Sequence, residues 1–321
     1  MMSALLSMRV ARKQAEAEGI CSFELVAADG RALPAFSAGS HLDVHVPDGP
    51  TRPYSLCNAP GETHRYLIAV LREPASRGGS AGMHERVHEG DVLHVSAPRN
   101  LFPLADGAQH HVLMAGGIGI TPMLAMAEAL AARGASFELH YCTRSAARTA
   151  FAPRLREAAF AGHVHVHHDD GPAAQKFDIA ARLATPQAGV HLYVCGPQGF
   201  MDALLGTARS RGWPEAQIHF ESFGAAPSVH DSDGPFEVLL QSSQRVVSVA
   251  KGQSIVQALA AAGVPVMTSC EQGVCGTCLT GVLDGTPDHR DQYLTPEEQA
   301  EGRQMLPCCS RAKSARLVLA L

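Results

Sequence analysis

Three cysteines stand close together in the stretch CEQGVCGTC, which covers residues 270–278. Their C-x4-C-x2-C spacing is typical of the loop that binds a plant-type [2Fe–2S] cluster, which needs one more cysteine further along the chain. Cys308 meets this need. A zinc site usually pairs one C-x2-C with a second one or with two histidines, and this stretch offers only one. The pattern therefore favours an iron–sulfur cluster held by Cys270, Cys275, Cys278 and Cys308 over zinc, or over thiols that only pack.

Small residues between these cysteines suit a tight loop. Gly273 and Gly276 allow the backbone to wrap closely and to aim N–H groups at sulfur, which stabilises added negative charge and raises the reduction potential. A fifth cysteine, Cys309, directly follows Cys308. We expect Cys309 to be a small packing residue, although its position would also let it replace Cys308 as a ligand.

A glycine-rich loop, AGGIGITPM at residues 115–123, follows the apolar run HVLMA and precedes a helical pattern. Gly117 and Gly119 allow the backbone to approach a phosphate closely. We expect Thr121 to be the N-cap of the helix and Pro122 to lie in its first turn. Because free N–H groups at a helix N-terminus attract anions, the loop predicts a pyrophosphate site; a tight turn that binds nothing is the alternative.

A second strand-to-helix turn, CGPQGFM at residues 195–201, supports a nucleotide site. Cys195 ends a predicted buried strand, and Gly196 and Pro197 follow it. The thiol should therefore lie at the carboxyl edge of a sheet, where such folds bind ligands. The segment TRS at 143–145 follows another strand, where an adenosine ribose would bind. It offers Arg144 and no acid to reject a 2′-phosphate, so these residues leave NADH and NADPH both open.

A third stretch, RPYSLCNAP at residues 52–60, is rich in polar and aromatic groups for a barrel strand. The guanidinium of Arg52 can hold a phosphate through two hydrogen bonds, and the ring of Tyr54 can pack on a flavin. The stretch SRGGS at 76–80 offers a second phosphate cradle through the N–H of Gly79 and the hydroxyl of Ser80. An ordinary strand and turn is the alternative.

Histidines also gather in one place. The segment HVHVHH at 163–168 puts His163, His165 and His167 on one face of a predicted strand and Val164 and Val166 on the other. The sequence contains no HExxH or comparable motif. We therefore expect a solvated histidine face over a buried valine face, and no histidine metal site.

Length and composition set the broad class. The 321 residues, 46% hydrophobic and 18% charged, allow two or three globular domains. The net charge of −5 argues against nucleic-acid binding, no apolar run is long enough for a membrane span, and the start lacks the features of a signal peptide. We expect a cytoplasmic protein, in which clustered thiols bind metal or do chemistry rather than form disulfides.

Three stretches with different patterns must position these residues. Residues 1–105 predict a small antiparallel β-barrel, with strands at Cys21–Ala27, Leu42–Val46, Tyr66–Arg72 and Asp91–Ala97 and a short helix near Gly82–Val87. Residues 106–226 alternate strands at 111–115, 137–142 and 190–195 with helices at 122–133 and 197–211, which predicts a mostly parallel α/β sheet. Residues 227–233 are small and polar and predict a linker. Residues 234–321 predict a small α+β domain with a hairpin, a helix ended by Gly263 and a closing strand.

Several of these motifs resemble those of one known family. The cysteine loop, with DHRDQYLT and MLPCCSRAKS after it, resembles the plant-type ferredoxin domain of the phthalate dioxygenase reductase family, which includes the reductases of vanillate-type O-demethylases. GGIGITPM with CGP resembles the NAD domain of the ferredoxin–NADP reductase superfamily, and Arg52, Tyr54 and Ser55 match its R-x-Y-S flavin motif. The resemblance implies a flavin-binding β-barrel, a Rossmann-like α/β nucleotide domain and a β-grasp [2Fe–2S] ferredoxin domain.

The same resemblance implies roles for particular residues. Thr121 and Cys195 would flank the nicotinamide, and Phe223 of the ESFG segment at 221–224 would cover one face of the flavin and move to admit the nicotinamide. The backbone around Ala69 would bind the pyrimidine edge of the flavin. The resemblance favours FMN over FAD and NADH over NADPH.

The implied function follows from how each cofactor handles electrons. A hydride donor gives two electrons together, an iron–sulfur cluster takes one at a time, and a flavin can do both. The resemblance implies a reductase that carries electrons from NADH through FMN to a [2Fe–2S] cluster and on to a Rieske-type terminal oxygenase. We expect a monomer that meets its oxygenase in a transient complex. Residues 227–321 hold ten acidic and seven basic residues, net −3, which predicts a mildly acidic docking face.

Two alternatives stay open. The first is a reductase for another acceptor, such as a heme or di-iron monooxygenase, which turnover with purified oxygenases would separate from the main hypothesis. The second is a non-catalytic redox sensor, which predicts negligible NADH–cytochrome c turnover. The intact nucleotide and flavin motifs argue against the sensor.

Overall fold

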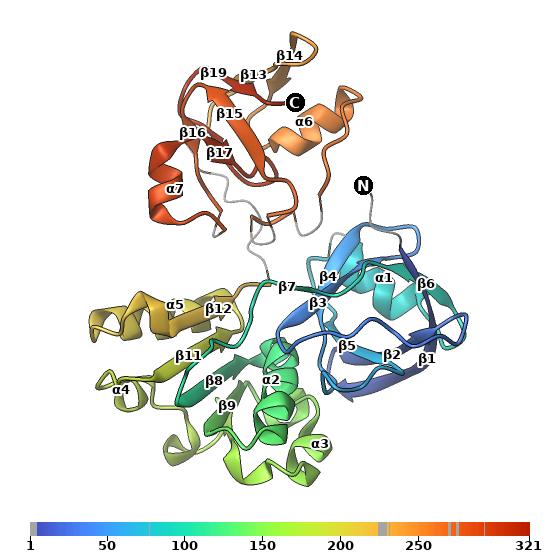
Figure 1. The fold of residues 1–321 in the computed structure, drawn as a ribbon, viewed down its shortest axis with the longest axis vertical. Helices are drawn as coiled ribbons and strands as arrows, with labels where there is room; N and C mark the ends of the chain where they lie inside the picture. The colour runs from blue at the N-terminus through green and yellow to red at the C-terminus, as the bar shows by residue number, and fades with distance from the viewer. Residues whose placement is uncertain are drawn as a thin grey trace. The chain divides into compact units, whose positions relative to one another are not determined.

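The computed structural model describes residues 5–76, 78–223, 230, 232–268, 271–273, 276–291 and 293–321. The chain divides into two compact units, Met1–Phe223 and Gly224–Leu321, and Figure 1 shows the elements of each. The boundary predicted at residue 105 falls inside the first unit, between two sheets, and stays a prediction. Among the described residues, no helix is long and apolar enough to cross a membrane.

The first unit begins with an antiparallel barrel, as the sequence predicts. Its strand order is β4-β3-β6-β1-β2-β5, with β7 paired to β3. Leu56, just after β4, bridges Ile68 of β5, so the chain closes the sheet on itself. The strands are β1 (Leu6–Ala17), β2 (Ile20–Ala27), β3 (Ser40–His45), β4 (Thr51–Ser55), β5 (Tyr66–Leu71), β6 (Val92–Val95) and β7 (Arg99–Asn100), and helix α1 covers Gly79–Arg86.

A five-stranded parallel sheet follows, in the order β10-β9-β8-β11-β12. Side chains of β8 alternate between its two faces: Leu113 and Ala115 pack with helix α2, whereas Val112 and Met114 pack with helix α5. The predicted α/β layering is therefore confirmed. The elements are β8 (His110–Gly116), β9 (Phe137–Thr143), β10 (Val164–His168), β11 (Val190–Cys195), β12 (Ile218–Glu221), α2 (Ile120–Ala132), α3 (Ala152–Glu157), α4 (Ile179–Arg182) and α5 (Gln198–Ser210). Short 3₁₀ turns are η1 (Gly117–Gly119), η2 (Ala146–Arg148), η3 (Ala161–His163), η4 (Ala173–Gln175) and η5 (Glu215–Gln217).

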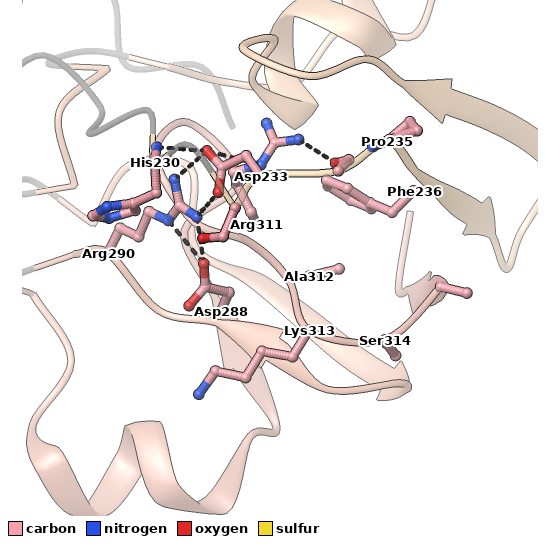
Figure 2. A pocket seen from close by; sticks show the side chains of 13 residues that line it. His230, Asp233, Pro235, Phe236, Asp288, Arg290, Arg311, Ala312, Lys313 and Ser314 are labelled. Atoms are coloured by element: carbon pink, nitrogen blue, oxygen red, sulfur yellow. Dashed lines mark hydrogen bonds and ion pairs between the residues drawn. The ribbon is translucent and has the colours of Figure 1, made fainter.

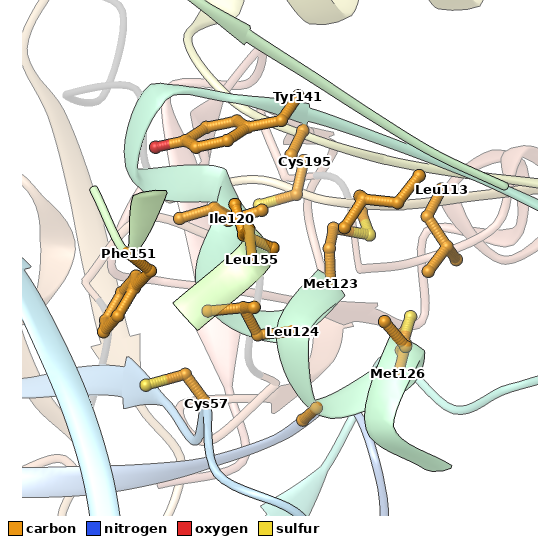
Figure 3. Packing of buried hydrophobic residues seen from close by; sticks show 14 of the residues in the cluster. Cys57, Leu113, Ile120, Met123, Leu124, Met126, Tyr141, Phe151, Leu155 and Cys195 are labelled. Carbon is orange, nitrogen blue, oxygen red and sulfur yellow. The ribbon is translucent and has the colours of Figure 1, made fainter. Parts of the chain in front are cut away.

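The barrel and the parallel sheet share one hydrophobic core. Cys57 and Ala69 of the barrel lie in the same buried cluster as Leu124 of α2 and Phe151, and Figure 3 shows Cys57 among these side chains. Arg154 of α3 adds a polar link, because its Nη1 donates to the carbonyl oxygen of Cys57 at 2.8 Å. The two sheets therefore pack as one body.

The histidine segment differs from the prediction. His163 lies in η3 and not in the strand, and Val164 and Val166 are only half-buried because β10 is an edge strand. His165 is exposed, as expected, but His167 is not simply solvated. Its Nε2 lies 3.1 Å from Nδ1 of His140 on β9, so a neighbouring side chain covers it.

The second unit is a mixed α+β fold. Its main sheet has the order β14-β13-β19-β15-β17, in which β13 pairs antiparallel with β14 and parallel with β19. Side chains from this sheet and from helix α6 form its core. The elements are β13 (Phe236–Leu240), β14 (Arg245–Val249), β15 (Thr280–Asp284), β16 (Pro287–Asp288), β17 (Gln304–Met305), β18 (Arg311–Ala312), β19 (Arg316–Leu319), α6 (Ile255–Ala261) and α7 (Pro296–Glu301).

Candidate functional site

The predicted nucleotide residues meet at the carboxyl edge of the parallel sheet. Cys195, the last residue of β11, is fully buried and lies opposite Ala115 on β8 and Glu221 on β12. The glycine loop leaves β8 at Gly116, and the turn CGP leaves β11 beside it. Parallel register therefore brings two loops together that are almost 80 residues apart in the sequence.

The two loops approach each other so closely that only glycine fits at several of their positions. A Cβ at Gly119 would overlap the carbonyl oxygen of Cys195, and one at Gly196 would lie 2.9 Å from Cα of Gly116. Gly117 has φ +53°, in the left-handed region that favours glycine. The loops thus pack backbone against backbone, which leaves their N–H groups close to any ligand at this edge.

The expected N-cap of α2 is wrong. The cap is Gly119, helix α2 begins at Ile120, and Thr121 is its second residue. The reason is that η1 runs directly into the helix, so helical geometry is reached before Thr121. The buried Thr121 hydroxyl donates to the carbonyl oxygen of Ile118 at 3.1 Å. No side chain caps this helix end, and the N–H of Ile120 already donates to the carbonyl oxygens of Gly117 and Ile118 within η1.

Helix α5 starts in a similar way on the other loop. Pro197 is its N-cap and makes no side-chain capping bond. The ring of Phe200, one turn into α5, fills the space beside both loops, since a Cβ at Gly116 or Gly196 would lie within 3 Å of it. Two uncapped helix starts therefore face the same sheet edge.

Arg52 and Gly79, predicted to bind a phosphate, are brought together. A Cβ at Gly79 would lie 2.9 Å from Cγ of Arg52, so the arginine stem rests on the first residue of α1. The cap of that helix, Gly78, has φ +94° and offers no side-chain bond. Ser80 is tied locally, because its Oγ accepts from the N–H of Glu73 and lies 3.1 Å from Oγ of Ser76.

A hydrogen bond joins the barrel to the parallel sheet at this site. Oγ of Ser55 donates to Oε2 of Glu221 at 3.1 Å, although the two residues are 166 positions apart. Burial raises the pKa of Glu221 to about 7, against the lowering effect of the Ser55 bond. Burial raises the pKa of the Cys195 thiol, and the Glu221 charge raises it further. Glu221 stands in the ESFG segment, but no local pattern assigns it a role, because its partner Ser55 is distant in the sequence.

The remaining predicted flavin residues lie in different surroundings. Tyr54 on β4 is half-buried, and burial raises the pKa of its hydroxyl. The Ala69 side chain points into the shared core, so only its backbone could meet a ligand. Phe223, two residues beyond β12, has 37% of its surface exposed.

The cysteine loop of the second unit is described in part. Cys270 and Cys275 lie outside the described residues. Cys278 and Cys308 are buried, and the pKa of the Cys308 thiol is raised well above its ordinary value by hydrogen bonding to Cys278, by hydrogen bonding to Cys309 and by burial. Two buried thiols within hydrogen-bonding reach of each other can act together as thiolate ligands, so this pair fits an iron site.

The loop around these cysteines has the tight wrap that its glycines predict. Gly273 has φ +76° and Gly276 has φ +70°. A Cβ at Gly273 would overlap Sγ of Cys309, and one at Gly276 would overlap the ring of Tyr293. The thiol of Cys309 lies 3.7 Å from the carbonyl oxygen of Leu306. Cys309 therefore packs beneath the loop, which supports its predicted packing role.

Comparisons with known proteins agree with this geometry. Residues 238–313 match the family model of the 2Fe-2S iron–sulfur cluster binding domain, and residues 96–218 match that of the N-terminal domain of dimethylamine monooxygenase subunit DmmA-like proteins. The chain is 56% identical over 313 residues to vanillate O-demethylase oxidoreductase of Pseudomonas putida, which covers 97% of this chain and 98% of that protein.

Two solved structures extend the comparison. Phthalate dioxygenase reductase, described as a modular structure for electron transfer from pyridine nucleotides to [2Fe–2S], has a TM-score of 0.79 and 43% identity over 99% of this chain and 98% of its own. An intact type IV self-sufficient cytochrome P450 monooxygenase has a TM-score of 0.83 and 38% identity, over 99% of this chain but 41% of its own.

Fold and site define an electron-transfer oxidoreductase built from a flavin- and nucleotide-binding unit and a [2Fe–2S] unit. The chain belongs to the phthalate dioxygenase reductase family, which includes the vanillate O-demethylase reductases. It is an NADH-dependent oxidoreductase with FMN and a [2Fe–2S] cluster as cofactors, and its relatives are the reductase components of oxygenase systems.

Proposed function

We propose that this chain is the reductase component of an O-demethylase that acts on a methoxylated aromatic acid. The observation that carries the proposal is the 56% identity, over nearly the full length of both chains, to vanillate O-demethylase oxidoreductase. Identity to phthalate dioxygenase reductase is lower, at 43%. The partner would be a Rieske-type terminal oxygenase that receives electrons singly in a transient complex, with the reductase as a monomer in the cytoplasm.

We assign the flavin phosphate to Arg52, Gly79 and Ser80. The contact of the Arg52 stem with the start of α1 supports this, because a guanidinium and an uncapped helix end both attract an anion. Tyr54, Ser55, Phe223 and the backbone around Ala69 would hold the ring system. When bound, FMN supplies the exchange between two-electron and one-electron chemistry.

We assign NADH to the edge of the parallel sheet. Gly117, Gly119 and Gly196 would hold its phosphates through backbone N–H groups, and Pro197, which has no N–H, would fix the turn that presents them. Thr121 and Cys195 would orient the nicotinamide. The uncapped starts of α2 and α5 support the phosphate assignment. The Ser55–Glu221 bond adds a positioning contact between the flavin and nicotinamide sides.

We assign the cluster to Cys270, Cys275, Cys278 and Cys308, with Cys309 as a packing residue. The crowding of the Cys278 and Cys308 thiols supports two of these ligands. Replacing Cys308 by Ser should remove NADH-driven reduction of the oxygenase but keep NADH–ferricyanide activity, which needs only the flavin half. Cys309→Ser serves as the matched control and should keep both activities.

A heme monooxygenase is the second candidate acceptor. The observation that favours it is the likeness, over 99% of this chain, to part of a self-sufficient cytochrome P450 monooxygenase. That match covers 41% of the longer protein. If the acceptor is a heme monooxygenase, the heme must be carried by a separate protein that takes electrons from this chain.

Reconstituted turnover separates the two candidates. Purified reductase, NADH and the oxygenase of a vanillate-type O-demethylase should release formaldehyde from vanillate, in proportion to NADH consumed. A cytochrome P450 in place of the oxygenase should give little turnover. The proposal is contradicted if formaldehyde is absent while the same reductase supports the cytochrome P450.

A further inference from the structure

A fully buried carboxylate, that of Asp291, lies beside the cysteine loop. Its side chain is 0% exposed. Oδ1 accepts from Oγ of Ser310 at 3.2 Å, and Oδ2 accepts from the backbone N–H of Leu294 at 2.9 Å. A Cβ at Gly273 would lie 2.9 Å from Cα of Asp291. Asp291 therefore contacts the cysteine loop at Gly273, the following residues of its own segment at Leu294, and the segment after Cys308 at Ser310.

The surroundings of Asp291 compensate its burial only in part. A buried carboxylate is costly unless it is paired or well hydrogen-bonded. Nδ1 of His289 lies 3.4 Å from Oδ1, with its side chain 9% exposed, but neither ring nitrogen of His289 makes a hydrogen bond. Each carboxylate oxygen accepts one hydrogen bond, so an asparagine at 291, with a single acceptor oxygen, could keep only one of the Ser310 and Leu294 bonds.

A nearby charge has a direct effect on a redox centre. Adding an electron to a cluster adds negative charge, so a fixed negative charge close by makes reduction less favourable. Inside a protein such an effect is screened much less than in water. Asp291 touches the loop at Gly273 and the ligand segment at Ser310, so it is placed to exert this effect.

We propose that Asp291 is a positioning residue that lowers the reduction potential of the cluster through its buried charge. The inference rests on the cysteine ligand set proposed above. The Ser310 and Leu294 bonds hold the carboxylate against the loop. The potential of the cluster is the quantity that this residue controls.

The same segment provides a matched control, Asp288. Its side chain is 27% exposed, and its Oδ2 accepts from Nε and Nη2 of Arg290 at 2.8 and 2.6 Å. Figure 2 shows Asp288 facing Arg290, which also bonds Asp233. Asp288→Asn removes the same charge three residues away, on a side chain that solvent reaches and an arginine already neutralises.

The test is a redox titration of the purified full-length protein with its cluster, followed by electron paramagnetic resonance. In Asp291→Asn the ratio of reduced to oxidised cluster at a fixed potential should rise about tenfold, which is about 59 mV for a one-electron centre. Asp288→Asn should change that ratio by less than about twofold. Flavin reduction by NADH should be unchanged in both variants.

A second variant keeps the proposal testable if Asp291→Asn loses its cluster. Ser310→Ala removes the hydrogen bond to Oδ1 of Asp291, and with it the bond from the N–H of Arg290, but keeps the carboxylate. The negative charge of Asp291 is then less well balanced, and the ratio of reduced to oxidised cluster should fall about twofold to threefold. The proposal is overturned by an unchanged potential in Asp291→Asn, by an equal shift in Asp288→Asn, or by an unchanged or raised ratio in Ser310→Ala. A wild-type protein with no cluster signal would instead refute the proposed function.

Discussion

Three side chains from distant parts of the first unit meet at one point. Ser55 comes from the barrel, whereas Cys195 and Glu221 end neighbouring strands of the parallel sheet. Sequence patterns predicted the positions of Ser55 and Cys195, because each stands in a local motif. They could not predict the role of Glu221, because a hydrogen bond across 166 positions leaves no local signal.

The raised pKa of Glu221 sets the direction of a pH effect. The folded protein holds this proton up to a pH of about 7, whereas the ordinary pKa is 4.5. The folded state therefore binds more protons than the unfolded state between these values, and its stability falls as pH rises through that range. Once the pH exceeds about 7, the stability contributed by this bound proton is lost.

Glu221→Gln should remove this loss, since glutamine is neutral at every pH. Melting temperatures of the variant and the wild type, read from flavin release, should nearly coincide at about pH 5 and diverge by about pH 8, where the variant melts higher. Glu215→Gln is the control: Glu215 is exposed, and its ion pair with Arg209 lowers the pKa of its carboxyl. This variant should show no rise in melting temperature at about pH 8. A constant difference across pH would refute the assignment.

Gly119→Ala tests the close approach of the two loops. Its new Cβ would overlap the carbonyl oxygen of Cys195, which is backbone and cannot turn away. The variant should lose about 2 kcal/mol of stability in urea unfolding and weaken NADH binding. Gly206→Ala, in an open position of α5, should instead stabilise by roughly 0.5–1 kcal/mol. Equal stability of the two variants would contradict the packing described.

Elements differ in how well the sequence predicts them. Strands β2, β5, β8 and β11 have clear apolar patterns and lie where predicted. The longest strand, β1, carries ARKQAEA over its second half and shows no strand pattern there. Pairing with β2 decides the structure of this half, since β6 pairs only with residues 6–9. Helix α7 did have a local signal, because Thr295 and Glu298 form a capping box.

Helix α6 depends on a similar cap. Ser254 accepts from the N–H of Gln257, and the Gln257 side chain accepts from the N–H of Ser254 in return. Ser254→Ala should destabilise the second unit by about 1 kcal/mol, measured by loss of cluster absorbance in urea. Ser243→Ala, at an exposed position of the β13–β14 turn, should change stability by less than about 0.3 kcal/mol. Equal effects would show that the cap does not matter.

At the scale of the whole molecule, strand and helix patterns together with the family resemblance predicted the fold class, and the comparisons confirm it. Sequence patterns could not show that the barrel and the parallel sheet share a core. Ala69 and Cys57 look like ordinary strand residues, and their contacts with α2 and α3 depend on chain segments far away. The stretch 227–233 stays a predicted linker, since most of it lies outside the described residues.

The charge of residues 227–321 predicts how the protein meets an oxygenase. Residues 227–321 carry a net charge of −3. If a complementary basic face speeds the encounter, the rate of oxygenase reduction should fall on the order of threefold when ionic strength rises several-fold. Potassium chloride and sodium sulfate at equal ionic strength should act alike. A rate independent of salt would refute an electrostatic docking face.

An anaerobic titration with NADH, followed by visible absorbance, tests the central claim most directly. The purified protein should show flavin bands and a broad reddish absorbance, and both should bleach. Because FMN takes two electrons and the cluster takes one, the end point should lie at about 1.5 NADH per chain. A colourless protein, a protein that carries only zinc, or cluster absorbance that NADH leaves unchanged would contradict the account.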